Sequence, residues 1–478
     1  MANRPIDQGP RTMTMKEETG TRLHRGLSSV EYFTFGFGTM VGVGWVVLMD
    51  DWLGRGGPAG AFLGFLFGGL LLLPVARTYG RMVAQIQDAG AEIAYTEGVF
   101  PPAVGFAAAW TMVLAYAIVC PWEAVAVGNL LARIVPAMND LPLYSVGGKV
   151  ITAPRLCAGL FLTAGVASIN TFGIRLSGIF QNVLTFGLLG LFAIFTGLGL
   201  LRGEAAHLEP LFSRPGTGGA ILSILLVLQI VPYFMTGFES VGKESEEARR
   251  GYDPRAFGRV ILIACVSGIL FYCSIIAAVS LVFPWKELVA GHMGTEAAFE
   301  RAFSSRGIAR LILVAALLSL IKIFNGNFVA STRLLFGIGK RGLVHPSLSR
   351  IHGRLGTPTF AILLMTVLTG AAAFLGDALL VPVTEVGSLA VGVGWFATCV
   401  SFLSRARRAP GRVPGRATAL AGAIVSAAVV LMKALPMVPG SFSRPEWIAF
   451  GLWCALGATF WITRPRTKPG APSRTIAS

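Results

Sequence analysis

Three ionisable residues stand inside long apolar stretches of the sequence. Glu123 lies in CPWEAVAVG, Glu239 ends the segment PYFMTGFE, and Lys322 lies in LSLIKIFNGNF. An isolated charge at the centre of a bilayer costs roughly 2.5–3.5 kcal/mol on insertion scales, so each of these residues is a functional candidate if the stretches cross a membrane. Buried carboxylates and amines can bind and release protons, and they can also balance the charge of an ion or of a small polar molecule.

The composition indicates that most of the chain is solvated by a lipid bilayer. Hydrophobic residues make up 54% of the 478 residues and charged residues 13%, compared with roughly 25% charged residues in soluble domains. Too little of the chain is polar to cover a soluble surface, whereas lipid solvates the apolar excess. The net charge of +16 does not indicate a nucleic-acid partner, because Lys and Arg collect in segments expected on the cytoplasmic side, as the positive-inside rule predicts.

Twelve apolar runs are long enough, at roughly 20 residues, to cross a bilayer as helices. We therefore predict an all-α integral membrane protein of the cytoplasmic membrane, with twelve transmembrane helices and both termini in the cytoplasm. Residues 1–28 would form a cytoplasmic segment, 29–404 a core of ten helices, 417–463 two further helices and 464–478 a cytoplasmic tail. The amphipathic stretch 286–306 predicts a short helix outside the bilayer. The predicted spans are residues 29–49, 59–76, 103–135, 154–172, 177–201, 219–241, 258–284, 307–338, 359–376, 382–404, 417–436 and 445–463.

The first and the sixth of these runs contain residues that disfavour a continuous helix. Gly38 and Gly42 lie in the first run, within GFGTMVGVG, and Gly237 lies in the sixth, five residues after a proline. The two runs occupy corresponding positions in the halves 29–201 and 219–404. This pattern is typical of membrane folds built from inverted repeats, in which interrupted helices near the middle of the membrane offer free backbone groups to a ligand. Alternatively, the glycines only allow helices to pack closely.

Longer motifs make the chain resemble one family of membrane proteins. The first run contains GTMVGVG and is followed by GRGGPAGAFLGF, the sixth contains PYFMTGFESVGKESEEARRGYDPRAFGRVI, and the eighth contains NFVASTRLLFGIGKRGLVHPSLSRIHGRLGTPTFAI. Over most of residues 25–405 the chain resembles the amino acid–polyamine–organocation permeases. The resemblance implies a LeuT-like fold, with a five-plus-five inverted-repeat core, discontinuous helices 1 and 6, and two extra helices. It also implies secondary transport of an amino acid or a related amine.

The resemblance assigns the substrate site to the two interrupted helices. By position, the N–H groups of Val43 and Gly44 would bind the substrate carboxylate, and the carbonyl groups of Met40, Tyr233 and Thr236 would bind its ammonium group. Helix termini suit these charges, because free N–H groups carry partial positive charge and free C=O groups partial negative charge. Val43 replaces a Ser or Thr that is common in the family, which removes one hydroxyl contact to a carboxylate.

More than one role fits each ionisable residue. Glu239 matches a glutamate that the family uses in proton coupling, and it could also cap the second half of the sixth helix, since the two roles are compatible. Glu123 could balance a cationic substrate, carry a proton or pair with a buried lysine. Lys322 could stand where sodium-coupled relatives hold a sodium ion, attaching the first helix to the eighth, or it could neutralise Glu123 or Glu239.

Aromatic residues in the sixth run predict a gate over the site. Tyr233 occupies the gate position of the family, and we also assign Phe238 to the gate, although Phe234 and Phe238 could both be core residues. Arg333 in the eighth run could form an ion pair with the acidic residues Glu244, Glu246 and Glu247 at an inner gate, or it could extend to the membrane surface.

No pattern in the sequence predicts an enzyme. GxSxG, HExxH and phosphate-loop motifs are absent, and the five histidines lie in or beside loops without ligand spacing. We therefore expect no cofactor and no metal. The expected partners are the lipid bilayer, an amino acid or amine as substrate, and protons; the sequence specifies no oligomeric state. The competing hypothesis is a non-transporting sensor or a channel-like protein on the same fold.

Overall fold

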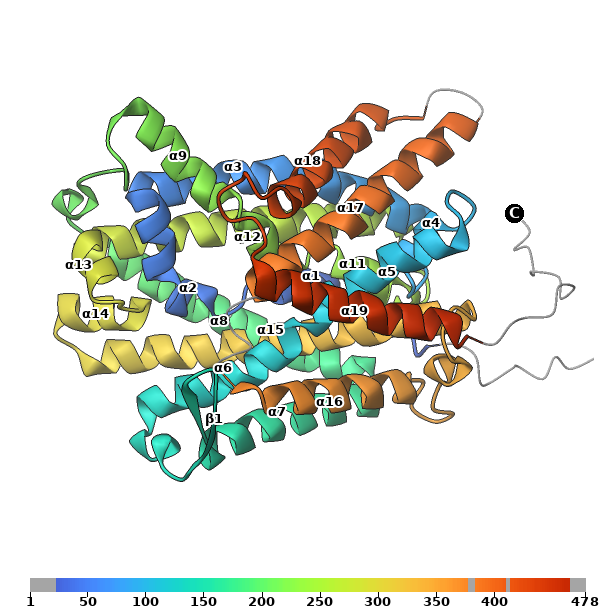
Figure 1. Ribbon diagram of the computed structural model, residues 1–478, viewed down its shortest axis with the longest axis horizontal. Coiled ribbons are helices and arrows are strands. Elements are labelled where there is room, and N and C mark those ends of the chain that lie inside the picture. Colours follow the sequence, from blue (N-terminus) through green and yellow to red (C-terminus); the bar gives the residue numbers. More distant parts are fainter. Residues whose placement is uncertain (1–22, 377–382, 410–412, 465–478) are drawn as a thin grey trace, which may run out of the picture.

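The computed structural model describes residues 23–376, 383–409 and 413–464, and these residues are mostly helical. The long helices run roughly along the longest axis of the molecule (Figure 1). One end of this axis carries α4 (Glu92–Thr96) and α11 (Ser240–Glu244). The other end carries α13 (Trp285–Ala290) and α14 (Thr295–Phe303). We call these the α4 end and the α14 end.

Ten helical segments of the described chain are long and apolar enough to cross a membrane. α16 (Thr359–Ala373) is apolar but shorter, and α19 (Arg444–Ile462) is long enough but is not among the ten. The all-helical membrane fold is therefore confirmed, whereas the predicted count of twelve spans is not. The ten segments are α1 (Ser29–Met40) with α2 (Gly44–Val47), α3 (Met49–Gln85), α5 (Pro102–Ala117) with α6 (Val119–Ile134), α7 (Ala153–Phe172), α8 (Ile174–Arg202), α9 (Gly216–Leu228) with α10 (Val231–Phe234), α12 (Pro254–Val282), α15 (Arg306–Lys340), α17 (Val383–Arg408) and α18 (Arg416–Ala434).

Local sequence explains where the first helices begin and turn. α1 starts with a capping box, in which the Ser28 N–H donates to Glu31 Oε2 at 2.9 Å, so the first free N–H groups of the helix are satisfied. α3 turns sharply at Gly57, whose φ of +67° strongly disfavours a residue with a Cβ. The end of the first predicted span and the whole second span therefore belong to one bent element.

Smaller elements cover both ends of the helices. The stretch 286–306 was predicted to form one short helix, but it contains two, most of α13 and the whole of α14. The Thr295 hydroxyl donates to the Trp45 carbonyl at 2.6 Å, which attaches α14 to α2. β1 (Pro142–Val146) and β2 (Lys149–Thr152) form an antiparallel hairpin that the sequence did not predict. Four short 3-10 helices complete the described chain: η1 (Pro136–Asn139), η2 (Ala205–Leu208), η3 (Ser245–Glu247) and η4 (Pro346–Ser349).

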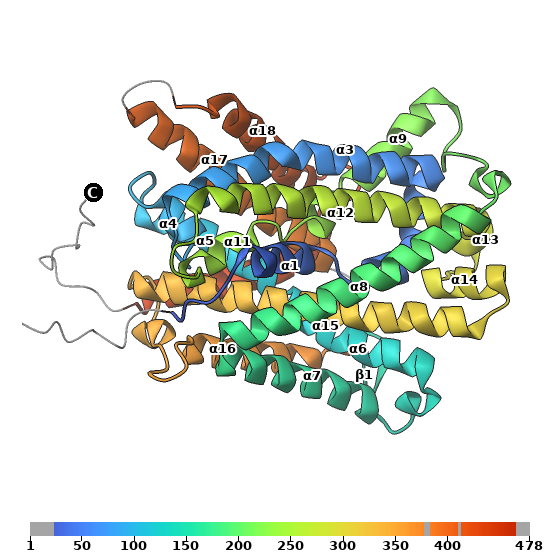
Figure 2. The same ribbon diagram turned by 180° about the vertical axis from the view of Figure 1, so that it is seen from behind.

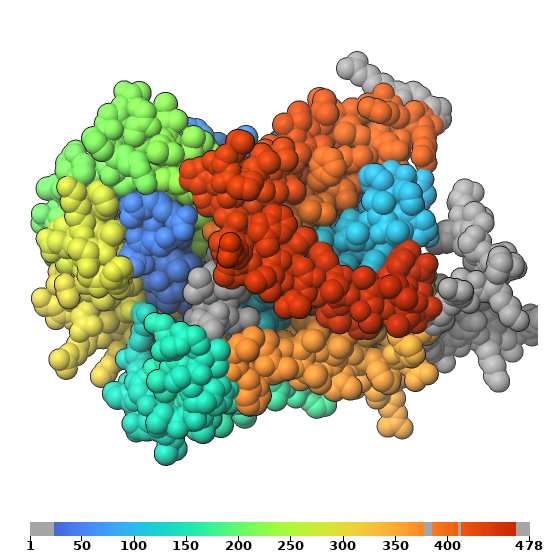
Figure 3. Space-filling model, in the orientation of Figure 1, coloured from blue at the N-terminus to red at the C-terminus, as the bar shows by residue number. Residues whose placement is uncertain are grey.

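The helices form a core around α1 and an outer layer. α1 is buried against α8, α12 and α15, and α8 crosses this group obliquely (Figure 2). α18 packs on α17 and α3, and α19 lies on the surface beside it (Figure 3). α19 is joined to α5 by two hydrogen bonds of 3.0 Å, because Trp110 and Trp453 each donate an indole N–H to the backbone carbonyl of the other. Large apolar side chains such as Phe161 and Leu201 are 81% and 83% exposed, as expected of surfaces that face lipid.

Candidate functional site

Both predicted helix interruptions are present, and they lie against each other. The first covers residues 41–43, between α1 and α2, and the second covers residues 235–239, between α10 and α11. Gly237, in the second, has a φ of +137°, and a Cβ added to it would lie 2.6 Å from the Met40 nitrogen. Only glycine allows so close an approach of two backbones. The prediction of two discontinuous helices is therefore confirmed.

The glycines of the first interruption have different roles. Gly42 lies within the interruption, whereas Gly38 lies inside α1, which continues to Met40. A Cβ on Gly38 would lie 2.2 Å from Gln181 Nε2 of α8. Gly38 therefore allows two helices to pack closely, which is the alternative that the sequence left open, and the helix breaks two residues later than Gly38.

Lys322 of α15 attaches itself to the first interruption. Its Nζ donates to the Val41 carbonyl at 2.6 Å and to the Gly38 carbonyl at 3.1 Å, and the side chain is fully buried. No ion pair joins Lys322 to Glu123 or Glu239 among the described residues. The lysine thus holds α15 to the unwound part of α1, and its ammonium group satisfies carbonyls that lipid could not.

Other side chains satisfy the remaining carbonyls of the first interruption. The Ser319 hydroxyl of α15 donates to the Gly42 carbonyl at 2.8 Å, and the Tyr272 hydroxyl of α12 donates to the Met40 carbonyl at 3.2 Å. Because a carbonyl oxygen has two lone pairs, the Met40 carbonyl retains capacity for one further donor.

A small buried cavity of about 30 Å³ lies between the two interruptions. This volume holds roughly two water molecules, so the site is closed. All six predicted substrate-binding residues line this one cavity, although they come from four helices and two chain breaks: Met40, Val43, Gly44, Glu123, Tyr233 and Thr236.

Two polar atoms of this cavity have no hydrogen-bond partner. Glu123 is 2% exposed, and its Oε2 is unpaired in the described chain; the same holds for the hydroxyl of Thr39, which is also 2% exposed. Glu123 faces the first interruption, since a Cβ on Gly42 would lie 3.4 Å from its Oε1. Buried polar atoms in proteins are normally paired, so these two indicate a place where a polar ligand is bound.

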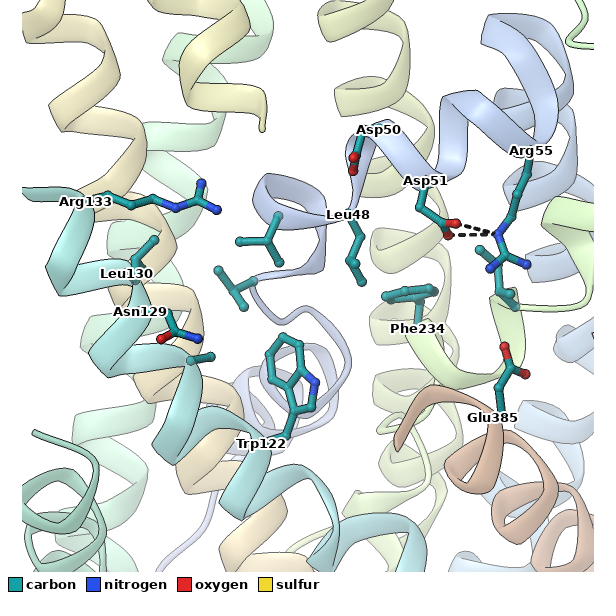
Figure 4. Close-up of a pocket in the computed structure, with 14 residues that line it drawn as sticks. Leu48, Asp50, Asp51, Arg55, Trp122, Asn129, Leu130, Arg133, Phe234 and Glu385 are labelled. Atoms are coloured by element: carbon teal, nitrogen blue, oxygen red, sulfur yellow. Dashed lines mark hydrogen bonds and ion pairs between the residues drawn. The ribbon is translucent and has the colours of Figure 1, made fainter. Parts of the chain in front are cut away.

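A larger cavity of about 530 Å³ lies toward the α14 end, where α2 and the start of α3 line it. Four residues line both cavities: Val43, Leu48, Trp122 and Phe234. Figure 4 shows Leu48, Trp122 and Phe234 among the residues around the larger cavity. Charged side chains line the larger cavity, and Asp51 and Arg55 form an ion pair of 2.8 Å there. We call the larger cavity the vestibule, and we call the four shared residues the partition between it and the closed cavity.

Two further predicted residues, Phe238 of the gate and Glu239 of the coupling site, lie in the second interruption. Glu239 is fully buried; its Oε1 accepts from the Tyr116 hydroxyl at 2.9 Å and its Oε2 from the Gly237 N–H at 3.1 Å. Phe238 stacks on Trp395 with ring centroids 5.6 Å apart. Neither Glu239 nor Phe238 is among the residues that line the two cavities, whereas Tyr233 lines the closed one.

Two buried ion pairs close the α4 end, and the sequence analysis found only one of them. Arg333 binds Glu247 through two hydrogen bonds of 3.0 and 3.1 Å, which is one of its two predicted roles. Lys243 Nζ lies 2.6 Å from Glu92 Oε1, and all four side chains are fully buried. Glu92 and Lys243 escaped notice because they lie outside the predicted spans, where charges are ordinary; only their buried contact makes them unusual.

A third ion pair lies at the surface of the α4 end. Arg341, just after α15, binds Asp88 of the loop before α4 at 3.1 Å. Burial alone would raise the pKa of Asp88, but the guanidinium of Arg341 and the ammonium of Lys340 hold this pKa below its ordinary value. This ion pair therefore joins the end of α15 to the loop before α4 and helps to close the α4 end.

Comparison with known proteins identifies the family of this chain. The family described as "Amino acid permease" matches residues 27–460. The amino-acid permease RocE of Bacillus subtilis (strain 168) is 25% identical over 401 residues, which cover 81% of this chain and 82% of that protein. The lysine-specific permease LysP of Lactococcus lactis subsp. cremoris (strain MG1363) is 26% identical over 82% of this chain and 77% of its own length. The aromatic amino acid transport protein AroP of Escherichia coli (strain K12) is 23% identical over 74% of each chain. This multi-pass membrane protein, with two interrupted helices around a closed cavity, therefore belongs to the amino acid permease family.

Proposed function

We propose that this chain is a secondary active transporter that moves an amino acid or a related amine across the cytoplasmic membrane by alternating access. The observation that carries the proposal is the closed cavity between the two helix interruptions, with its unpaired Glu123 and Thr39 oxygens. A cavity that is buried from both sides and holds unsatisfied polar groups suits a substrate that must leave water on one side before it returns to water on the other.

In the proposed complex, the substrate carboxylate binds the N–H groups of Val43 and Gly44, and its ammonium group binds the carbonyls of Met40, Tyr233 and Thr236. These residues line the closed cavity. The cavity is too small for an amino acid, so the partition and Tyr233 move when the substrate arrives. The segments α1–α2 and α9–α11 then rock against α5–α6 and α15, as expected of two inverted repeats, 29–201 and 219–404.

Coupling to protons is favoured over coupling to sodium. The ammonium group of Lys322 already occupies the carbonyls of Gly38 and Val41, where a sodium ion would need oxygen ligands. Glu239 is the proposed proton carrier, because it is buried beside the second interruption and accepts a hydrogen bond from Gly237 of that interruption. Protonation of Glu239 would weaken its hydrogen bond with Gly237, and proton binding would so be coupled to a movement of α11.

The names of the relatives leave the substrate open within this class. One relative is described as specific for lysine and another as a transporter of aromatic amino acids. Because both share about a quarter of their residues with this chain, family membership supports an amino acid as substrate without selecting its side chain.

The test uses the purified full-length protein in proteoliposomes. Labelled amino acids and amines should enter with saturable kinetics, an imposed pH gradient should drive accumulation, and replacing sodium by choline should have no effect. Glu239→Gln should lose the response to the pH gradient while keeping exchange of labelled for unlabelled substrate, which needs no net proton movement. An unchanged pH response in this variant would remove Glu239 from the coupling mechanism.

The competing function is a non-transporting sensor or a channel on the same fold. A channel would pass substrate without saturation, and a sensor would bind a ligand of the panel without any flux. Either result would overturn the transporter proposal.

A further inference from the structure

We propose that Glu123 selects substrates that carry a second cationic group, a primary ammonium on an aliphatic chain, as basic amino acids and diamines do. This inference rests on the proposed transport function and adds a substrate class to it. The α-ammonium group of an amino acid already has the three backbone carbonyls as partners, so Glu123 is left for another positive group.

The lining of the closed cavity contains an acidic side chain and no basic one. Glu123 is the one charged side chain among the residues that line it, and no lysine, arginine or histidine belongs to that lining within the described chain. The remaining polar side chains are neutral hydroxyl and amide groups, from Thr39, Thr236, Asn327 and Tyr233. A cavity with one acid and no base is complementary to a cation.

One oxygen of the Glu123 carboxylate is left without a hydrogen bond in the described chain. Lys322 interacts with Glu123 electrostatically, but it forms no ion pair with Glu123 and donates its hydrogen bonds to the carbonyls of Gly38 and Val41. Glu123 Oε2 is buried and unpaired. A buried carboxylate oxygen without a hydrogen bond is costly, and a substrate ammonium group would supply the missing charge-assisted hydrogen bond.

Aromatic rings surround the place where the ammonium group would lie. Trp122, Tyr233 and Phe234 line the same cavity as Glu123. The faces of such rings attract ammonium ions, most strongly when water is excluded. A carboxylate among three rings is an arrangement that favours an organic ammonium ion over a neutral aliphatic side chain of equal length.

The experiment compares the binding of three ligands to the purified full-length protein by isothermal calorimetry. Lysine carries the second ammonium group, norleucine has the same chain length without it, and cadaverine carries two ammonium groups without a carboxylate. We expect lysine to bind at least roughly tenfold more tightly than norleucine. Cadaverine distinguishes the two classes of ligand, because it lacks the carboxylate of an amino acid. It should bind tightly if the site accepts diamines, and weakly if the site requires a basic amino acid.

Variants of Glu123 assign the preference to this residue. Glu123→Gln should weaken lysine binding by roughly tenfold or more and leave norleucine binding within about twofold, whereas Glu123→Asp, which keeps the charge, should retain part of the preference for lysine. Asp51→Asn is the matched control, because Asp51 lies in the vestibule and is already paired with Arg55. This variant should leave the ratio of lysine to norleucine affinities unchanged.

Two results would overturn the inference: wild-type protein that binds norleucine as tightly as lysine and cadaverine, or a Glu123→Gln variant that weakens lysine and norleucine equally. The second result would mean that Glu123 acts on the α-ammonium group or as a proton carrier. Saturable uptake of norleucine into proteoliposomes would then still support transport, so the two proposals can fail separately.

Discussion

At the scale of single residues, Lys322 is the side chain that most directly connects two helices of the site. Its ammonium group binds two carbonyls of the interrupted first helix, and Ser319, one turn earlier, binds a third. These oxygens form the kind of carbonyl and hydroxyl cluster that coordinates sodium in broken-helix transporters. A lysine in this place provides a positive charge that is part of the chain.

Removing the lysine should therefore create a sodium site. Lys322→Ala removes the lysine hydrogen bonds to the Gly38 and Val41 carbonyls, which should destabilise the protein by about 1–3 kcal/mol. Sodium added in place of choline should raise the melting temperature of this variant and leave that of the wild type unchanged. Lys340→Ala, which removes a half-exposed lysine, is the control and should show no sodium response. Sodium stabilisation of the wild type would contradict this assignment.

At the scale of elements, the site depends on the contact between the two interruptions. The backbone of Gly237 lies so close to Met40 and Thr39 that a Cβ would meet their backbone atoms at 2.6 to 2.7 Å. Two broken helices can share one cavity only if their unwound segments approach in this way, and glycine at this single position permits it.

Gly237→Ala should force the interruptions apart and abolish uptake of substrate into proteoliposomes. Gly251→Ala is a matched control, because Gly251 also has a positive φ, of +77°, but has no atom within 4 Å of the added Cβ. Both variants carry backbone strain, so a defect that is specific to Gly237→Ala reports the crowding. Equal uptake by the two variants would show that the contact is dispensable.

Most of the elements of the fold, and the residues of the cavity, could be predicted from the sequence because lipid imposes strong rules on length and polarity. Gly42 and Gly237 marked the two interruptions. The family pattern assigned five residues to one cavity, and Glu123 was singled out as a charge inside an apolar run. Partners could not be predicted, because a contact such as Lys243 with Glu92 joins residues 151 positions apart. Nor did composition reveal that Lys322 binds carbonyls rather than a carboxylate.

At the scale of the whole molecule, the two ends differ in their openness. The α4 end is fastened by the pairs Arg333–Glu247, Lys243–Glu92 and Arg341–Asp88, whereas the α14 end contains the vestibule. From the positive-inside rule we propose that the α4 end lies in the cytoplasm; in that orientation the structure corresponds to a form that is closed toward the cytoplasm.

Thiol labelling of intact cells tests this orientation. In a background of Cys157→Ser and Cys454→Ser, which removes the two exposed cysteines, Ala126→Cys in the vestibule should react with an impermeant reagent added outside the cell. Ala330→Cys, at a fully buried position of α15, is the control and should not react. Labelling of Ala126→Cys only in inverted membrane vesicles would reverse the proposed orientation.

The partition is thin, because its residues, among them the rings of Trp122 and Phe234, line both chambers. A molecule with a slender amine head and a rigid, bulky tail would place its head in the closed cavity and its tail in the vestibule, and would hold the partition open. The proposed transport cycle would then stop with the ligand bound, because the partition could not close over it. If the chain transports its substrate as proposed, we therefore expect effective blockers to be longer than the substrate, because they would reach across the partition as well as bind in the closed cavity.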